Sequence, residues 1–184
     1  MKDAVALWHA EHAKFSRLLD TIQNLLADSR AGAPIDHEWL RDIVSYLHRY
    51  GHALHHPRED IGFAHLLTKA PELAETIARL EAEHTRIFTD GEALEARLEQ
   101  VVAGALVSRE AIEVLAYGYI DLQREHLAIE EDVIIPRIAQ TFDATDWALV
   151  GARIDEQVNQ AHPGLEEHFM RLSRHISSTA AANR

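Results

Sequence analysis

Four long stretches of the chain repeat apolar residues at intervals of three or four positions. This interval is that of one face of an α-helix, and each stretch is many turns long. A helix that is apolar on one face folds stably only by burying that face against other elements. The first stretch shows the pattern in full, at Val5, Trp8, Phe15, Leu19, Ile22 and Leu26. The periodicity therefore predicts an all-α protein.

Breaks in the periodicity mark where each helix begins and ends. Asp36 and Ser108 are suited to N-cap positions, and Pro57 interrupts the second helix. Short loops between long helices favour antiparallel neighbours, so we expect an up-down-up-down four-helix bundle. The expected helices cover about residues 3–28, 37–67, 71–103 and 108–136.

The C-terminal part of the chain differs from the four long repeats. Two shorter amphipathic pieces are expected at about 146–160 and 163–176, followed by a tail of small residues, 177–184, that we expect to fray. We interpret residues 1–141 as the four-helix bundle. Residues 142–184 are expected to form a helical extension with two short additional helices packed on it.

Composition narrows the classes of function. The chain has 30 acidic and 18 basic side chains, a formal charge of −12, which repels nucleic acid and anionic membranes. No apolar run approaches the length of a membrane span. The first residues lack the basic-then-apolar order of a secretory signal, so we expect a cytoplasmic location.

Histidine is over-represented and cysteine is absent. The chain has 13 histidines and no cysteine, which excludes disulfides, thiolate nucleophiles and iron–sulfur clusters. Any metal must therefore be held by nitrogen and oxygen. Imidazole is a common metal ligand and is costly to bury without a partner, so the positions of the histidines decide their meaning.

Histidines and glutamates replace apolar residues at the inward positions of the helices. Two helices carry a histidine followed four residues later by a glutamate, a spacing that puts both side chains on one helical face. The other two helices each carry one histidine within the apolar stripe. The predicted metal ligands are His12, His55, Glu59, His84, His126 and Glu130.

This set fits two divalent ions better than one. Glutamate can bridge two metals whereas a histidine binds one, so Glu59 and Glu130 as bridges would give each ion two imidazoles and two carboxylate oxygens. Imidazole and carboxylate ligands with open positions suit two non-haem iron ions, and manganese or zinc is chemically possible. A single histidine on an apolar face is more often a hydrogen-bonded core residue. Metal binding explains the burial of four histidines and two glutamates on four helices better than six separate hydrogen bonds do.

Other polar residues are weaker candidates. His48, His52, His56 and Asp60 have near-helical spacing and could support the ligands or form an alternative row of ligands, although a solvated or rim face is the more common reading. The tyrosines at 46, 50 and 119 are expected mainly to pack in the core. The glutamates that precede ligand histidines are interpreted as mostly surface charges, because adjacent helical residues diverge by about 100°. They are Glu11, Glu83 and Glu125.

These residues resemble the hemerythrin-like family, which includes bacterial domains named for a His-His-Glu cation-binding motif. The resemblance covers about residues 5–136 and rests on His12, His55-His56-Pro57-Arg58-Glu59, Glu83-His84 and His126 through Glu130-Glu131, in that order. It implies a carboxylate-bridged di-iron site in a four-helix bundle. Relatives use such sites to bind oxygen, to sense oxygen or iron, or to handle nitrosative and oxidative damage.

The chain departs from the oxygen carriers of this family on the third helix, and two choices of ligand stay open. Phe88 stands where the carriers have a second histidine on the third helix, which leaves the expected metal pair more open and disfavours simple oxygen transport. The carriers' spacing would select Glu131 in place of Glu130, although the four-residue spacing faces better. A kink at Pro57 could exchange the roles of His55 and His56.

Three classes of function remain after these comparisons of spacing. The first is a di-iron protein that binds or senses a small diatomic ligand such as oxygen or nitric oxide. The alternative is a di-iron redox enzyme, or an iron-delivery or repair protein, that acts on peroxide, nitric oxide or damaged iron centres. A third is an interaction module with a structural metal. A ferritin-like bundle is disfavoured, because it needs two Glu-x-x-His motifs and only Glu81 with His84 qualifies.

Overall fold

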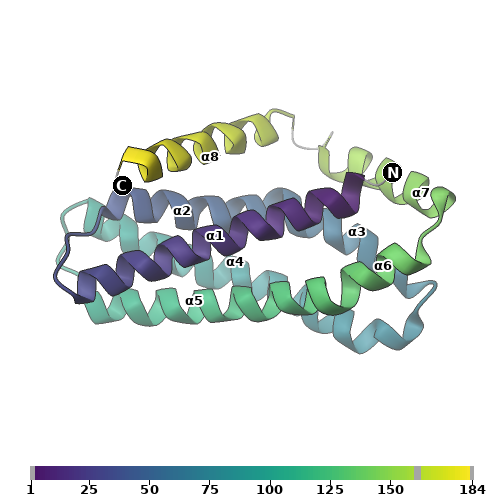
Figure 1. The fold of residues 1–184 in the computed structure, drawn as a ribbon, viewed down its shortest axis with the longest axis horizontal. Helices are drawn as coiled ribbons and strands as arrows, with labels where there is room; N and C mark the ends of the chain where they lie inside the picture. The colour runs from purple at the N-terminus through teal and green to yellow at the C-terminus, as the bar shows by residue number, and fades with distance from the viewer. Residues whose placement is uncertain (1–2, 160–162, 183–184) are drawn as a thin grey trace.

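Four long helices make up most of the protein. The computed structural model describes residues 3–159 and 163–182, in which every regular element is helical. The helices α1 and α4 each pack against both α2 and α5, and Figure 1 shows the four running lengthwise side by side. Their bounds are Asp3–Arg30 for α1, His37–Tyr50 for α2, Ala74–Val102 for α4 and Arg109–Ile129 for α5. The predicted all-α class is confirmed, whereas the up-down-up-down order stays a prediction.

Two of these helices continue through a single π-helical turn. The turn η1 (Gly51–His55) joins α2 to α3 (His56–Leu67), and η3 (Glu130–Ile134) joins α5 to α6 (Ile135–Thr141). In η1 the N–H of His56 donates to the carbonyl of Gly51, five residues earlier, and Ile135 does the same to Glu130. A proline follows directly in each case. Proline lacks an N–H and clashes with the carbonyl four residues back, so the wider turn accommodates it without breaking the helix.

Side-chain caps fix where helices begin. Asp36 accepts a hydrogen bond from the backbone of Trp39, and Ser108 accepts one from Ala111, as their positions predicted. The third long segment begins with a short 3-10 helix, η2 (Pro71–Leu73), before α4.

The C-terminal extension packs along the bundle. It consists of α7 (Ala144–Ile154), the π-helical turn η4 (Asp155–Asn159) and α8 (Leu165–Ala182). The helix α7 packs on α3, and α8 packs on α2 and lies above the bundle in Figure 1. The expectation that the tail frays is wrong for residues 177–182, which continue α8. Residues 183–184 and the expected helical position 160 lie outside the described residues.

Buried apolar side chains form two clusters at different levels of the bundle. One contains Phe15 on α1 and Ile87 on α4, and the other contains Trp8 and Leu80 on the same two helices. On α1 and α4, positions 12 and 84 fall between members of the two clusters. The predicted ligands therefore lie at a polar level between two apolar ones.

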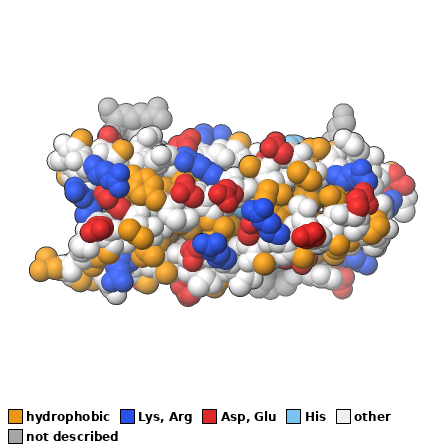
Figure 2. Space-filling view, turned by 90° about the horizontal axis from the view of Figure 1, so that it is seen from below, with side chains coloured by type: hydrophobic (Ala, Val, Ile, Leu, Met, Phe, Trp, Pro, Cys, Tyr) orange, Lys and Arg blue, Asp and Glu red, His pale blue; other side chains and the backbone are white. Residues whose placement is uncertain are grey.

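The outer surface shows mixed charge. Figure 2 shows Lys and Arg side chains interspersed with Asp and Glu over one face of the molecule. Within the described residues, no helix is long and apolar enough to cross a membrane.

The helices α2 and α4 approach each other closely at Gly91. A Cβ atom there would lie 2.4 Å from the Cβ of His48 and 3.1 Å from the ring of Tyr119. The imidazole of His48 also lies 2.6 Å from the carboxylate of Glu95 on α4, which holds the two helices in register.

Replacing Gly91 tests this close approach. We expect Gly91→Ala to lower the free energy of unfolding by about 1–3 kcal/mol, because the β-carbon of His48 cannot move without its helix. Gly118 is a matched control, since its added Cβ would meet nothing within 4 Å. Gly118→Ala should raise stability by about 0.4–1 kcal/mol in urea unfolding. Equal effects of the two substitutions would contradict the close contact.

Candidate metal centre

Seven buried histidine and glutamate side chains meet in the polar level of the bundle. Each of them is 6% exposed or less. They form two groups, and within each group the possible ligand atoms lie within 4.8 Å of one another. The first group is His12, His55, Glu59 and Glu130, and the second is His56, His84 and His126.

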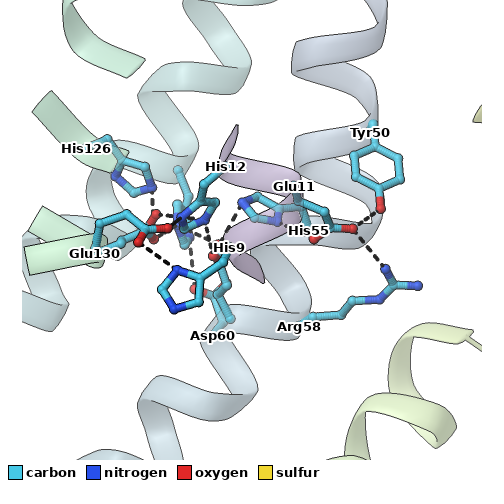
Figure 3. Close-up of polar contacts among 12 residues, drawn as sticks. His9, Glu11, His12, Tyr50, His55, Arg58, Asp60, His126 and Glu130 are labelled. Carbon is cyan, nitrogen blue, oxygen red and sulfur yellow. Dashed lines mark hydrogen bonds and ion pairs between the residues drawn. The ribbon is translucent and has the colours of Figure 1, made fainter. Parts of the chain in front are cut away.

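The two carboxylates extend from one histidine group to the other. One oxygen of Glu59 lies 3.0 Å from Nε2 of His12, and its other oxygen lies 3.9 Å from Nε2 of His84. Glu130 repeats this arrangement, with one oxygen 3.5 Å from Nε2 of His12 and the other 3.1 Å from Nε2 of His126. Figure 3 shows Glu130 among the histidines. Each carboxylate thus presents one oxygen to each group, the arrangement that a bridge between two ions requires.

The outer nitrogens of four histidines are held by carboxylates. In each case Nδ1 lies 2.7–3.1 Å from a carboxylate oxygen, so that Nε2 points inward. Partners of this kind orient a ligand imidazole and raise its basicity. The pairs are Glu11 with His55, Asp60 with His84, Glu83 with His126 and Glu131 with His12.

These pairs run around the bundle from helix to helix. An acid on α1 holds the histidine of the second long segment, whose own acid holds the histidine of α4. The acid of α4 holds the histidine of α5, and the acid after α5 returns to His12 on α1. Each acid is next to a predicted ligand in sequence but supports a ligand on the neighbouring helix.

The inward atoms lack the partners that buried polar groups normally have. Among the described residues, Nε2 of three histidines, one oxygen of Glu59 and both oxygens of Glu130 have no hydrogen-bond partner. Such groups are costly to bury unless something compensates them. Divalent cations bind neutral imidazole and carboxylate, so the donors present fit a metal ion.

Burial and close contact shift the pKa values of the side chains in the centre. Burial and the neighbouring charge of Glu130 raise the pKa of Glu59 well above its usual value. Burial would also raise the pKa of Glu130, but the histidines around it lower that pKa overall. Burial alone would lower the pKa of His84, yet its contacts with Asp60 and Glu130 raise it to about 10. The raised pKa values of Glu59 and His84 favour protons on both groups. A bound cation could balance the same carboxylate charge in place of those protons.

The π-helical turn η1 allows two consecutive histidines to face the centre. In a regular helix His55 and His56 would diverge by about 100°, and a wider turn reduces this angle. The ring of His56 stacks on that of His84, with centroids 4.1 Å apart. It also lies 3.2 Å from where a Cβ on Gly51 would be, so glycine leaves room for it.

The structure brings all six predicted ligand residues together, although their role as ligands stays a prediction. The spacing argument missed His56 as a seventh member. His56 had been considered in a separate row of polar residues and as a replacement for His55 at the Pro57 kink, but not as an additional member. Glu130 lies inside the centre, whereas Glu131 contacts His12 from outside.

The interpretation of Glu11 and Glu83 as surface charges is wrong. Glu11 is buried and Glu83 is partly buried, because each faces a histidine on a neighbouring helix. Glu125 is exposed, as expected. Of the alternative row, His48 is buried against Glu95 and His52 is exposed and stacks on Phe88.

Glu11 connects the centre to the C-terminal extension. Its carboxylate accepts hydrogen bonds from Tyr50 and from Nδ1 of His55, and it lies 3.7 Å from the guanidinium of Arg58 (Figure 3). The same guanidinium lies 3.6 Å from Glu166 on α8. Tyr46 instead accepts a hydrogen bond from Lys14.

Comparison with known protein families identifies the family of most of the chain. The family described as the hemerythrin HHE cation binding domain matches residues 3–138, which include every member of the candidate centre. A comparison with curated proteins finds no match.

Substitution of Glu59 tests whether the centre requires a cation. In metal-free protein we expect Glu59→Gln to raise the free energy of unfolding by about 1–3 kcal/mol, because it removes a carboxyl whose ionisation burial and Glu130 oppose. With divalent cation present the variant should lose the stabilisation that the ion gives wild type. Urea unfolding with and without chelator measures both effects.

Glu95 provides the matched control for that experiment. Burial would raise its pKa, but hydrogen bonds from His48, Ser45 and Arg49 lower it to about 2. Glu95→Gln should therefore destabilise the protein at pH 7 by about 1–3 kcal/mol, with or without metal. Destabilisation of the metal-free protein by Glu59→Gln would contradict our interpretation.

Proposed function

Because the chain belongs to the hemerythrin HHE cation-binding domain family, we propose that its centre holds a pair of non-haem iron ions. One observation carries this proposal: Glu59 and Glu130 each present one oxygen to each histidine group. Two carboxylates that can bridge two sets of imidazoles match a site for two ions. A single ion in one histidine group would leave the other histidine group without a metal. We propose that the helices around it have the up-down-up-down order of a four-helix bundle.

The donors are divided unequally between the two ions. The ion near His12 and His55 would receive two imidazoles, and the ion near His84 and His126 would receive a third from His56. With two bridging carboxylates, the first ion would have four protein donors and the second would have five. An octahedral ion prefers six donors, so the first ion would keep more open positions. His56 thereby compensates for the histidine that Phe88 replaces.

We propose that a small diatomic ligand, oxygen or nitric oxide, binds at the open positions. The bound iron pair would supply electrons or coordination to such a ligand. The protein's own side chains set the environment: Nδ1 of four of the five histidines is held by a carboxylate, and apolar clusters above and below limit water. Mixed nitrogen and oxygen donors favour iron, with manganese or zinc as chemical alternatives. The cytoplasm is the compartment we propose.

A second candidate is a redox enzyme or an iron-delivery or repair protein. The observation that favours it is the hydrogen-bonded chain from Tyr50 through Glu11 to His55. Both Tyr50 and Glu11 line a cavity of about 360 Å³ beside α8. This chain would let a molecule in that cavity exchange a proton with the side chains that hold the centre.

Metal analysis tests the proposed centre. Protein produced with iron should hold two irons per chain, and His55→Ala and Glu130→Ala should each lose most of that iron. Each substitution removes a donor, and Glu130→Ala also removes a bridge. Absence of metal from an iron-replete preparation would refute the centre. With the loaded protein, an oxygen adduct that reverses on deoxygenation supports binding or sensing, whereas steady turnover with a reductant supports the enzyme.

The role of His56 is tested separately. We expect His56→Ala to weaken binding of one of the two ions by about 10–100-fold, the range for losing a group that supports a metal site. The other ion should stay tightly bound. His52→Ala is the matched control, since His52 lies four residues before His56, in the turn η1, but is exposed. Competition with a chelator of known affinity measures both, and an unchanged second affinity in His56→Ala would show that His56 is not a ligand.

A further inference from the structure

A cavity of about 380 Å³ opens on the surface between α1 and α5, directly beside the candidate centre. It is lined by His9, His12 and Glu131 together with small residues such as Ala13 and Ala128. His12 is also a member of the first ligand group. The ring of one candidate ligand therefore separates this cavity from the interior of the centre.

His12 presents one nitrogen to each side. Its Nε2 faces Glu59 inside the bundle, and its Nδ1 lies 2.7 Å from one oxygen of Glu131 on the cavity side. The other oxygen of Glu131 lies 2.7 Å from Nδ1 of His9. The side chains of His9 and Glu131 are 48% and 34% exposed, against 3% for His12. The three residues thus form a graded path from solvent to the buried centre.

We propose that His9, Glu131 and the outer nitrogen of His12 form a loading site, at which a divalent cation binds before it passes into the centre. Two imidazoles and one carboxylate are a donor set that binds divalent transition metals. Binding requires each ring to offer a lone pair at Nδ1, so its proton moves to Nε2 or to water. This inference rests on the proposed metal function and adds the route by which metal arrives.

The surroundings of the loading site favour a passing cation. Arg124, which also lines the cavity, is paired with Asp20 at 2.6 Å, so its charge is compensated. Glu131 remains as a carboxylate facing two imidazoles, in a chain of net charge −12. The attraction for a cation therefore comes from the carboxylate of Glu131 and from the net negative charge of the chain.

The other three outer carboxylates do not combine these features. Glu11 is buried and holds the hydroxyl of Tyr50 as well as His55. Asp60 and Glu83 each contact a ligand histidine, but the structure gives neither a second imidazole on its outer side. Among the described residues, only Glu131 joins an exposed histidine to a buried one.

The experiment measures how fast metal-free protein takes up Co²⁺, whose absorption reports coordination. Stopped-flow mixing at low micromolar Co²⁺ should show His9→Ala loading about tenfold more slowly than wild type, the lower end of the loss expected when a group that helps to hold the ion is removed. The final number of bound ions and the affinity should be unchanged, because His9 lies outside the centre. Release to excess chelator should slow by the same factor, since loading and release share one path.

Two further variants sharpen the test. His9→Asp keeps a cation ligand and should restore most of the wild-type rate. His175→Ala is the matched control, because His175 is an exposed imidazole 3.5 Å from Asp42 and outside this cavity. It should load at the wild-type rate.

The outcomes separate this inference from the proposed function. If wild type binds no Co²⁺ or iron, the centre itself fails. If wild type fills two sites and His9→Ala fills them equally fast, the centre stands and the loading site is refuted. A lower final affinity or fewer ions in His9→Ala would also overturn the inference, because His9 would then belong to the centre.

Discussion

Two buried carboxylates placed within reach of the same histidines are the constraint on which the rest of the structure depends. Glu59 and Glu130 are 1% and 0% exposed and face a common space from different helices. Neither could be buried there as a bare anion at tolerable cost, and hydrogen bonds alone do not satisfy them. The two apolar clusters on either side offer no compensating charge, so positive charge is required at that level. Protonated imidazoles can supply part of it, and the family match to a cation-binding domain points to a metal ion as the other source.

The helical backbone adapts to this requirement at two points. Glu130 begins the π-helical turn η3, and Glu59 follows the turn η1 by four residues. Each turn stands directly before a helix whose second residue is proline, and the wide turn resolves the conflict between proline and a regular helix. Each π-helical turn changes the direction in which the following side chains of its helix point, close to the polar level of the bundle. In η1 the result is that His55 and His56 both reach the centre.

The helices and the inward histidines and glutamates could be predicted from the sequence because both follow from one periodicity. A stripe repeating every three or four residues locates the helices and shows where histidine or glutamate replaces an apolar residue. His56 could not be found this way, since its position is correct only after a π-helical turn. Pro57 indicated a disturbance but not its form. The continuation of α8 through residues 177–182 was also missed, because small residues give a weak periodic signal.

The outer carboxylates show a different limit of reading one helix at a time. Glu11 and Glu83 each precede a ligand in sequence and were assigned to the surface, because adjacent residues point about 100° apart. That angle points the glutamate away from the predicted ligand beside it on the same helix. In a bundle of four helices, the same angle points the glutamate toward the neighbouring helix. There Glu11 meets His55 and Glu83 meets His126. A residue beside one predicted ligand is therefore well placed to contact a predicted ligand on the neighbouring helix, and four such pairs close a ring around the bundle. Since each pair joins two segments, the ring fixes the spacing of the helices and the direction of the imidazoles together.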